Sequence, residues 1–568
     1  MPGRESSVLI LGLDGATFDL ILPWVEEGHL PTIGRLLEQG AASRLRSTIP
    51  PITPCAWSSF MTGKNPGKHG LFDFVEPVPG SHEMRFTNAS SRHAESLWAL
   101  LSRQGRRVGV VNVPMTYPPE PVNGYLISGL DTPHERSPFM YPLSLKQELR
   151  GQSIHYGIDM QHLGNMHTDS RRQKLLEEMR DLESTRTKTL KYLSRTYPAD
   201  FRMIVYGSTD QIAHHFWHYM DPKHDKYDAE GAKRFSTAVR DAYAHVDRQI
   251  ASILEDEDDE TIVMIMSDHG FGPTTSVRLR LNQILEHHGL LNFVPERKSG
   301  RVKRALAGAL DRVLRFTLSS DAKRTLAGLF PRLRVWFEGL DEAQVDWRHT
   351  TAYVHEAFRS DPGIWLNHAS RGSDSVAQTD EQLEEALTKV ENILRSVKDP
   401  RTGKPAISEV YRTRDVYHGP YGEQAPDLIP SWWQDGFLLE QSVPGGPADK
   451  MVERSMTPIQ GGVEFSATHR LDGVFVVAGG PTKQGHWFNG ADITDVAPTV
   501  LYLMGLPIPG DMDGRPLLEA FDEHFVAEHP PQFDQAGAPQ PVSTQHQAFT
   551  EEEEALIAKR LQALGYIE

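Results

Sequence analysis

The stretch Val8-Leu9-Ile10-Leu11-Gly12-Leu13-Asp14-Gly15 decides the fold. It is an apolar run of strand length that ends in an Asp-Gly turn signal. A strand that is apolar on both faces is typical of a parallel sheet covered by helices on each side. Helical periodicity follows over residues 18–27 and 31–39. This order of strand and helix predicts a βαβ arrangement from the first residues onward.

The same alternation continues along the chain. Further strands are predicted at residues 108–113, 201–206, 261–266 and 473–477, and helices at 94–104, 177–193, 236–254 and 495–503. We therefore predict an α/β sandwich with a mostly parallel central sheet and helices on both faces.

Composition narrows the function. The 568 residues carry a formal net charge of −17, which argues against a surface that binds nucleic-acid phosphates. The single cysteine, Cys55, excludes an intrachain disulfide, so a transition-metal site would use mainly carboxylates and the 25 histidines. We find no apolar run of the ~18–20 residues that span a bilayer, and no signal-peptide pattern. We expect a cytoplasmic protein; the oligomeric state stays open.

Two segments differ from the rest. Residues 297–336 are basic with helical periodicity, which predicts a helical insertion or a membrane-surface or partner helix. Residues 527–549 are rich in Pro and Gln and are typical of a linker. The predicted organisation is a core over 1–295, a basic helical insertion and candidate cap over 296–345, a second part of the core over 346–526, and a linker with a C-terminal helix over 527–568.

Metal-capable residues follow three of the predicted strands. Asp14 follows residues 8–13, and Asp268 and His269 follow residues 261–266. A helix that begins near residue 209, after a third strand, would place Asp210 and His214 on one face at i,i+4 spacing. Ligands bind beyond the carboxyl ends of parallel strands, so these side chains are candidates for one site.

Thr53 stands in a loop before a predicted helix. Pro54 suits the first helical position, so Thr53 would be the N-cap. In the structural interpretation its hydroxyl only caps the helix. In the functional one it is a nucleophile at a helix N-terminus, where N–H groups and the helix dipole favour an anion.

These segments carry a resemblance. The chain resembles the alkaline phosphatase superfamily, in particular its type I phosphodiesterase/nucleotide pyrophosphatase branch. The matching segments, in the order of the family, are Leu11–Gly15, Thr53–Gly70, Asp210-x3-His214, Ser267–Gly270, and Thr468-His469-Arg470 with Asp472-Gly473.

The resemblance implies an alkaline-phosphatase-like fold and two divalent metal ions, usually Zn²⁺, with Mn²⁺ as the alternative. One ion would be held by Asp14, Thr53, Asp268 and His269, and the other by Asp210, His214 and His469. It implies that Thr53, with the pKa of its hydroxyl lowered, attacks a small phosphoester and passes through a phosphothreonine intermediate. Three ligand carboxylates against two Zn²⁺ leave a net attraction for a phosphate anion.

The remaining positions concern specificity. Phe74 stands where nucleotide pyrophosphatases place an Asn that supports a phosphate oxygen, so we expect a phosphodiesterase or phosphomonoesterase of unassigned substrate. Lys64 and Arg470 are further candidate substrate contacts. A sulfatase would need Pro or Ala at Trp57 and Arg at Ser59. The alternatives left open are a phosphoglycerate-mutase-like phosphotransferase and a catalytically silent metal-binding scaffold.

Overall fold

The computed structural model describes most of the chain. The described residues are 7–78, 84–158, 166, 168–294, 345–356, 363–369, 371, 376–377, 379–456, 465–534 and 549–564. The predicted basic insertion at 296–345 lies, except for Val345, outside the described residues.

A single large sheet organises the core. In spatial order its strands are β20 (His486–Trp487), β2 (Gly40–Arg46), β19 (Asp472–Ala478), β9 (Ile262–Met266), β1 (Val8–Leu13), β8 (Phe201–Tyr206), β5 (Val108–Val113), β6 (Gly124–Ser128) and β7 (Met140–Tyr141), and β21 (Ala491–Asp492) also pairs with β2. The central strands are parallel, with β1 between β8 and β9. β19 runs antiparallel to β9 and β2, and β7 antiparallel to β6. The mostly parallel sheet is therefore confirmed.

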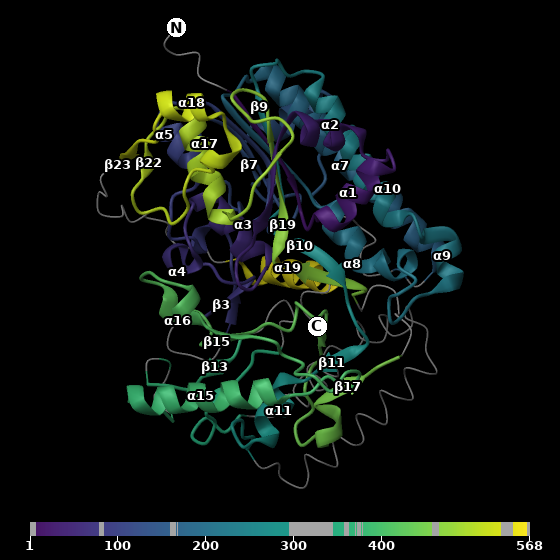
Figure 1. The fold of residues 1–568 in the computed structure, drawn as a ribbon, viewed down its shortest axis with the longest axis vertical. Coiled ribbons are helices and arrows are strands. Elements are labelled where there is room, and N and C mark those ends of the chain that lie inside the picture. Colours follow the sequence, from purple (N-terminus) through teal and green to yellow (C-terminus); the bar gives the residue numbers. More distant parts are fainter. Residues whose placement is uncertain are drawn as a thin grey trace.

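Helices cover both faces of this sheet, as predicted (Figure 1). Val8 and Ile10 of β1 belong to an apolar cluster with α3 (Thr53–Thr62), α5 (Leu97–Arg103) and α17 (Val496–Leu503). Leu9, Leu11 and Leu13 point to the opposite cluster, because side chains alternate along a strand. That cluster contains α1 (Phe18–Glu26), α2 (Pro31–Gln39), α7 (Asp169–Thr196), α8 (Ser208–Met220) and α10 (Ala238–Leu254).

A second lobe, defined here as residues 277–294 and 345–454, lies below the sheet in Figure 1. It has its own apolar cluster, built around Trp365, Trp433 and Val390. Its elements are α11 (Leu281–His287), α15 (Asp380–Ser396), α16 (Thr413–Val416) and the short strands β11 (Val277–Leu279), β12 (Ala352–Tyr353), β13 (Trp365–Leu366), β14 (Val410–Arg412), β15 (Leu428–Pro430), β16 (Leu438–Leu439) and β17 (Val452–Arg454). The described residues of 346–454, which open the stretch predicted as the second part of the core, thus pack mainly in this lobe.

The end of the chain also differs from the predicted division. β23 (Phe533–Asp534) pairs with β22 (Ile508–Pro509), so the first residues of the expected linker stay with the core. The C-terminal helix α19 (Glu551–Leu564) buries Ile557 and Leu561 in the α1 side of the core. Within the described ranges, no helix combines the length and apolar character that crossing a membrane requires.

Candidate active site

The register of the parallel strands brings the candidate ligands to one edge of the sheet. Val8 of β1 pairs with Phe201 of β8 and with Ile262 of β9, so the three strands end at nearly the same level. Asp14 follows β1, α8 begins just after β8, and Asp268 and His269 follow β9. The carboxylate and imidazole side chains that follow these strands therefore lie close to one another.

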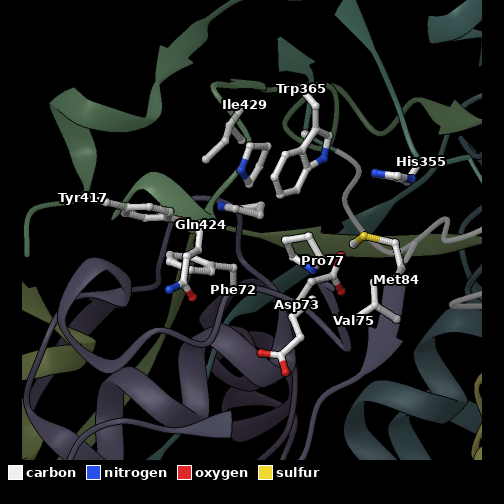
Figure 2. Close-up of a pocket in the computed structure, with 14 residues that line it drawn as sticks. Phe72, Asp73, Val75, Pro77, Met84, His355, Trp365, Tyr417, Gln424 and Ile429 are labelled. Carbon is white, nitrogen blue, oxygen red and sulfur yellow. The ribbon is translucent and has the colours of Figure 1, made fainter. Parts of the chain in front are cut away.

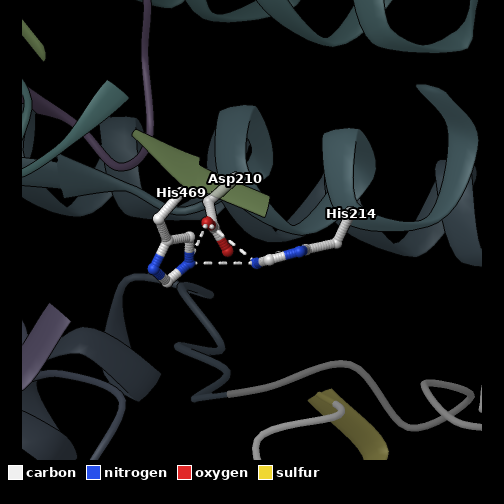
Figure 3. A group of neighbouring side chains, drawn as sticks. All are labelled: Asp210, His214 and His469. Carbon is white, nitrogen blue, oxygen red and sulfur yellow. Dashed lines mark hydrogen bonds and ion pairs between the residues drawn. The ribbon is translucent and has the colours of Figure 1, made fainter. Parts of the chain in front are cut away.

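Asp210 and His214 lie one turn apart on α8, as the i,i+4 spacing predicts. The Asp210 Oδ1 atom is 3.3 Å from His214 Nε2 and 3.5 Å from His469 Nε2 (Figure 3). Ligand atoms of these three buried residues all lie within 4.8 Å of one another.

His469 reaches the cluster through a short antiparallel ladder. β10 (Gly270–Pro273) follows His269, and β18 (Ala467–Arg470) pairs with it so that Phe271 faces His469. The His269 and His469 rings stack with centroids 3.7 Å apart. A chain separation of about two hundred residues hides this pairing from local sequence patterns, and only the family resemblance pointed to His469.

A second group surrounds His269. Its Nε2 lies 3.3 Å from Asp268 Oδ2 and 3.7 Å from Asp14 Oδ1. Ligand atoms of Asp14, Asp210 and His269 also lie within 4.8 Å of one another, so Asp210 borders both groups. The two groups are contiguous, which is the arrangement that a two-metal site requires.

The three imidazoles share one orientation. Each Nδ1 lies at hydrogen-bond distance from a backbone carbonyl: His214 from Ala467 at 2.8 Å, His469 from Pro51 at 2.8 Å and His269 from Gly270 at 3.0 Å. A carbonyl oxygen only accepts, so Nδ1 carries a proton and Nε2 is the ring nitrogen that faces the cluster. This is how backbone partners fix metal-binding histidines in proteins.

The carboxylates show the complementary pattern. Asp14 Oδ1, Asp210 Oδ1 and Asp268 Oδ2 are buried oxygens that receive no hydrogen bond from any described residue. Orphaned anionic oxygens in a buried site are costly unless a cation lies among them. The donor set therefore fits divalent cations, because buried carboxylate oxygens and imidazole nitrogens converge at one place.

Without cations, the charges of this cluster conflict. Burial, together with the charges of Asp268 and Asp210, raises the pKa of Asp14 well above its usual value. Burial raises the pKa of Asp268 to about 8. Burial also acts on Asp210, but His214 and His469 outweigh it and hold its pKa below the usual value. Bound cations would favour the ionised form of all three carboxylates.

Thr53 begins α3 and is fully buried at the edge of this cluster. The N-cap residue is Ile52, one position earlier than predicted, so the Thr53 hydroxyl does not have the capping position. Its Oγ1 atom instead lies 3.4 Å from His269 Nε2. The hydroxyl faces the ligands from the positive end of the helix dipole.

The three side chains predicted to contact substrate, Lys64, Phe74 and Arg470, have other contacts in the structure. Lys64 forms an ion pair with Asp511, and Phe74 is buried in the apolar core on the α1 side of the sheet. The Arg470 guanidinium donates to the carbonyls of Trp433 at 2.8 Å and Pro273 at 2.6 Å. These contacts argue for structural roles, because the cationic groups already have partners.

A narrow pocket lies between the core and the second lobe (Figure 2). Phe72 on the core side and Trp365 and Tyr417 in the second lobe give it an aromatic lining. Its cavity volume is about 40 Å³, room for a small apolar group. Pro50 forms part of its wall and stands three residues before Thr53, so the Cα atoms of Pro50 and Thr53 lie within about 11 Å of each other.

Sequence reasoning missed the groups that support the ligands. Trp57 Nε1 lies 3.4 Å from Asp14 Oδ2, and the Gly15 N–H donates to Asp268 Oδ1 at 3.2 Å. Thr209 Oγ1 donates to the carbonyl of Asp14, and Ser47 Oγ to that of Asp268. The sequence offered one signal for Trp57: it stands four residues after Thr53 in a predicted helix, so the two side chains share a face.

The sheet is covered by helices on both faces and has a carboxylate–imidazole cluster beyond its strand ends. This arrangement is typical of the alkaline phosphatase superfamily. The sequence model of the type I phosphodiesterase / nucleotide pyrophosphatase family matches residues 8–431. The chain belongs to this family, whose members are hydrolases that act on phosphoester bonds.

A solved structure shares the fold. Phosphonoacetate hydrolase from Sinorhizobium meliloti 1021 superposes with a TM-score of 0.51 at 12% sequence identity, over 88% of this chain and 95% of that chain. Human ectonucleotide pyrophosphatase/phosphodiesterase 5 gives a TM-score of 0.48 at 11% identity, over 92% of this chain and 99% of that chain. No curated protein matches the chain by sequence.

Proposed function

We propose that this protein is a two-metal phosphoric ester hydrolase of the phosphodiesterase/pyrophosphatase type, with Thr53 as its nucleophile. One cation would be held by Asp14, Thr53, Asp268 and His269. The other would be held by Asp210, His214 and His469. Zn²⁺ suits this mixture of imidazole and carboxylate ligands, and Mn²⁺ is the competing ion.

A single observation carries this proposal. Orphaned carboxylate oxygens and imidazole Nε2 lone pairs converge next to the buried Thr53 hydroxyl. A purely structural cluster would be expected to pair its buried anions with hydrogen-bond donors. A buried hydroxyl beside such a cluster is the arrangement that nucleophilic catalysis at phosphorus needs.

Divalent cations, when bound, would lower the pKa of the Thr53 hydroxyl and offset the negative charge that develops on the leaving oxygen. Thr53 Oγ1 would then give up its proton to solvent and attack phosphorus, and the bond to the ester oxygen would break as that oxygen takes up a proton from water. A second water would attack phosphorus and the bond to Thr53 Oγ1 would break, with the proton of the attacking water passing to Oγ1. The N-terminus of α3 favours the anionic phosphoryl group throughout.

The substrate class is a small phosphoester. Phe74 stands at the position where a nucleotide pyrophosphatase would place an Asn, which disfavours a dedicated nucleotide substrate. The aromatic pocket between Phe72, Trp365 and Tyr417 supports an apolar substituent on the ester. A phosphomonoesterase or a mutase-like phosphotransferase would use the same metals and nucleophile but a different acceptor or ester.

Hydrolysis of phosphomonoesters, phosphodiesters, nucleotides and sulfate esters by Zn²⁺-loaded protein tests the proposal. We expect turnover of at least one phosphoester and little of sulfate esters. Mass spectrometry of acid-quenched protein should show a phosphoryl adduct on the peptide that contains Thr53. Metal binding without turnover of any ester would favour the silent scaffold, and phosphoryl transfer to a second alcohol in place of water would favour the phosphotransferase.

A further inference from the structure

Trp57 lies on the same face of α3 as Thr53, since residues four apart on a helix are neighbours. Its side chain is fully buried, and its indole packs edge to face against Phe60 with ring centroids 5.9 Å apart. The indole Nε1 donates towards Asp14 Oδ2 over 3.4 Å. The helix that provides the proposed nucleophile thus also contacts a proposed metal ligand.

The strand that carries Asp14 is shaped for this contact. Gly12 is the last residue but one of β1, and a Cβ atom there would approach the Trp57 ring to 2.9 Å and Val205 to 2.8 Å. Both distances are shorter than van der Waals contact allows. A glycine in a strand interior weakens the strand, and here it admits the indole against β1, two residues before Asp14.

The contact gives the two carboxylate oxygens of Asp14 different environments. Oδ2 receives the indole N–H, whereas Oδ1 receives no hydrogen bond from any described residue and lies 3.7 Å from His269 Nε2. Asp268 repeats the pattern, because Gly15 N–H holds its Oδ1 and its Oδ2 faces His269. For Asp268 the donor is backbone, but for Asp14 it is a side chain that mutation can remove.

We propose that Trp57 is a positioning residue for the metal centre: its indole N–H holds one oxygen of Asp14 so that the other is presented to a divalent cation. This inference rests on the proposed function. Donors to the second atom of a metal ligand fix its orientation, and their loss typically lowers metal affinity by about 10- to 100-fold. Trp57 itself touches neither the cation nor the substrate.

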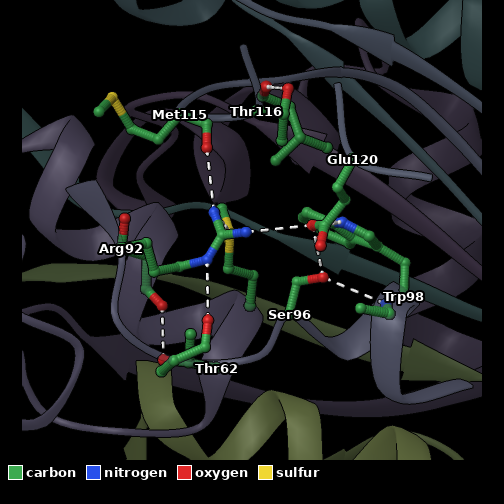
Figure 4. Close-up of polar contacts among 12 residues, drawn as sticks. Thr62, Arg92, Ser96, Trp98, Met115, Thr116 and Glu120 are labelled. Atoms are coloured by element: carbon green, nitrogen blue, oxygen red, sulfur yellow. Dashed lines mark hydrogen bonds and ion pairs between the residues drawn. The ribbon is translucent and has the colours of Figure 1, made fainter. Parts of the chain in front are cut away.

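The test compares Trp57→Phe with a matched control, Trp98→Phe. Trp98 is fully buried in the same apolar cluster as Trp57. Its indole N–H donates to Glu120, which keeps Arg92 and Ser96 as donors (Figure 4). In both variants a buried tryptophan loses an indole N–H that donates to a carboxylate, but only Trp57 contacts a proposed ligand.

Zn²⁺ affinity is measured by competition with a chromogenic chelator, independently of turnover. In Trp57→Phe we expect one of the two binding steps to weaken about 10- to 100-fold and the other to change less than about twofold. Trp98→Phe should bind Zn²⁺ like the unaltered protein. The inference is overturned if Trp57→Phe binds like Trp98→Phe, or if both binding steps weaken equally.

A second replacement at position 57 keeps the test decisive if Trp57→Phe does not fold. 3-Benzothienylalanine at position 57 keeps the shape of the indole and lacks only the N–H, so the weakened binding step should persist. Unchanged Zn²⁺ affinity with this residue overturns the inference. If the unaltered protein binds no Zn²⁺ or Mn²⁺, the proposed function fails instead, and the two failures are thereby distinguished.

Discussion

Replacing Thr53 by valine separates the capping interpretation from the nucleophile interpretation. Thr53→Val exchanges Oγ1 for a methyl group of nearly the same size in a fully buried position. Because α3 has Ile52 as its N-cap residue, the substitution removes no capping hydroxyl. The polar contact at stake is the approach of Oγ1 to His269 Nε2 at 3.4 Å, which is long for a hydrogen bond.

The two interpretations predict different changes in the free energy of unfolding and in kcat/KM. Loss of a capping hydroxyl costs about 1 kcal/mol of stability, within a range of about 0.5–2 kcal/mol. A typical intramolecular hydrogen bond contributes about 1 kcal/mol, and a contact as long as that of Oγ1 with His269 Nε2 contributes less. We therefore expect the free energy of unfolding of the metal-free protein to change by less than about 0.5 kcal/mol. Loss of a nucleophile should lower kcat/KM by about 10³-fold or more, equivalent to about 4 kcal/mol of transition-state stabilisation.

Two assays read these quantities separately. Hydrolysis of a chromogenic phosphodiester by Zn²⁺-loaded protein gives kcat/KM, and urea unfolding in the presence of a chelator gives stability. Thr53→Ser is the matched control, because it keeps the hydroxyl and should retain part of the activity. Thr53→Val with activity within tenfold of the unaltered protein would refute the nucleophile. A stability loss of about 1 kcal/mol would refute the local geometry.

Three further predictions follow from individual contacts. Asp210→Asn should lower bound Zn²⁺ from about two to about one per chain in elemental analysis, because a neutral amide replaces a carboxylate ligand; two retained ions would contradict the ligand assignment. Arg470→Met should lower the free energy of unfolding by about 2 kcal/mol, since backbone carbonyls lose a charged donor, with little change in KM; a selective rise in KM without loss of stability would show a substrate contact instead. Trp365→Ala should raise KM about tenfold for aryl phosphodiesters and little for methyl esters, because the aromatic pocket loses a wall. Equal changes in KM for both esters would show that this pocket does not bind the ester substituent.

The core of the fold could be predicted because its strands are long and apolar on both faces. The run Val8–Leu13 and its partners at 201–206 and 261–266 carry that signal in the sequence, and their register then follows from parallel pairing. The second lobe could not be predicted in the same way. Its strands have two or three residues, as in Ala352–Tyr353 and Leu438–Leu439, too few for a period to show.

The candidate site was predictable for the same reason as the sheet. Asp14, Asp210, His214, Asp268 and His269 follow the ends of strands, so the fold class alone places them at one edge. His469 reaches the cluster because the short strands β10 and β18 pair, and no local sequence pattern predicts this pairing. The Trp57 contact depends on the packing of α3 against β1, and the hydrogen bonds of Arg470 depend on loops from both lobes.

The burial that holds these ligands together also explains why the cluster favours cations. Asp14 and Asp268 sit where apolar core meets the sheet edge, and that environment raises the pKa of both carboxyls. A metal-free chain must therefore protonate them or accept unpaired buried charge, and either state costs stability near neutral pH. Two divalent cations at the proposed site would remove this conflict and leave the centre electropositive, because their charge exceeds that of the three carboxylates. Under the proposed function, the residues that make the free site unfavourable would thus also favour a phosphate anion beside Thr53.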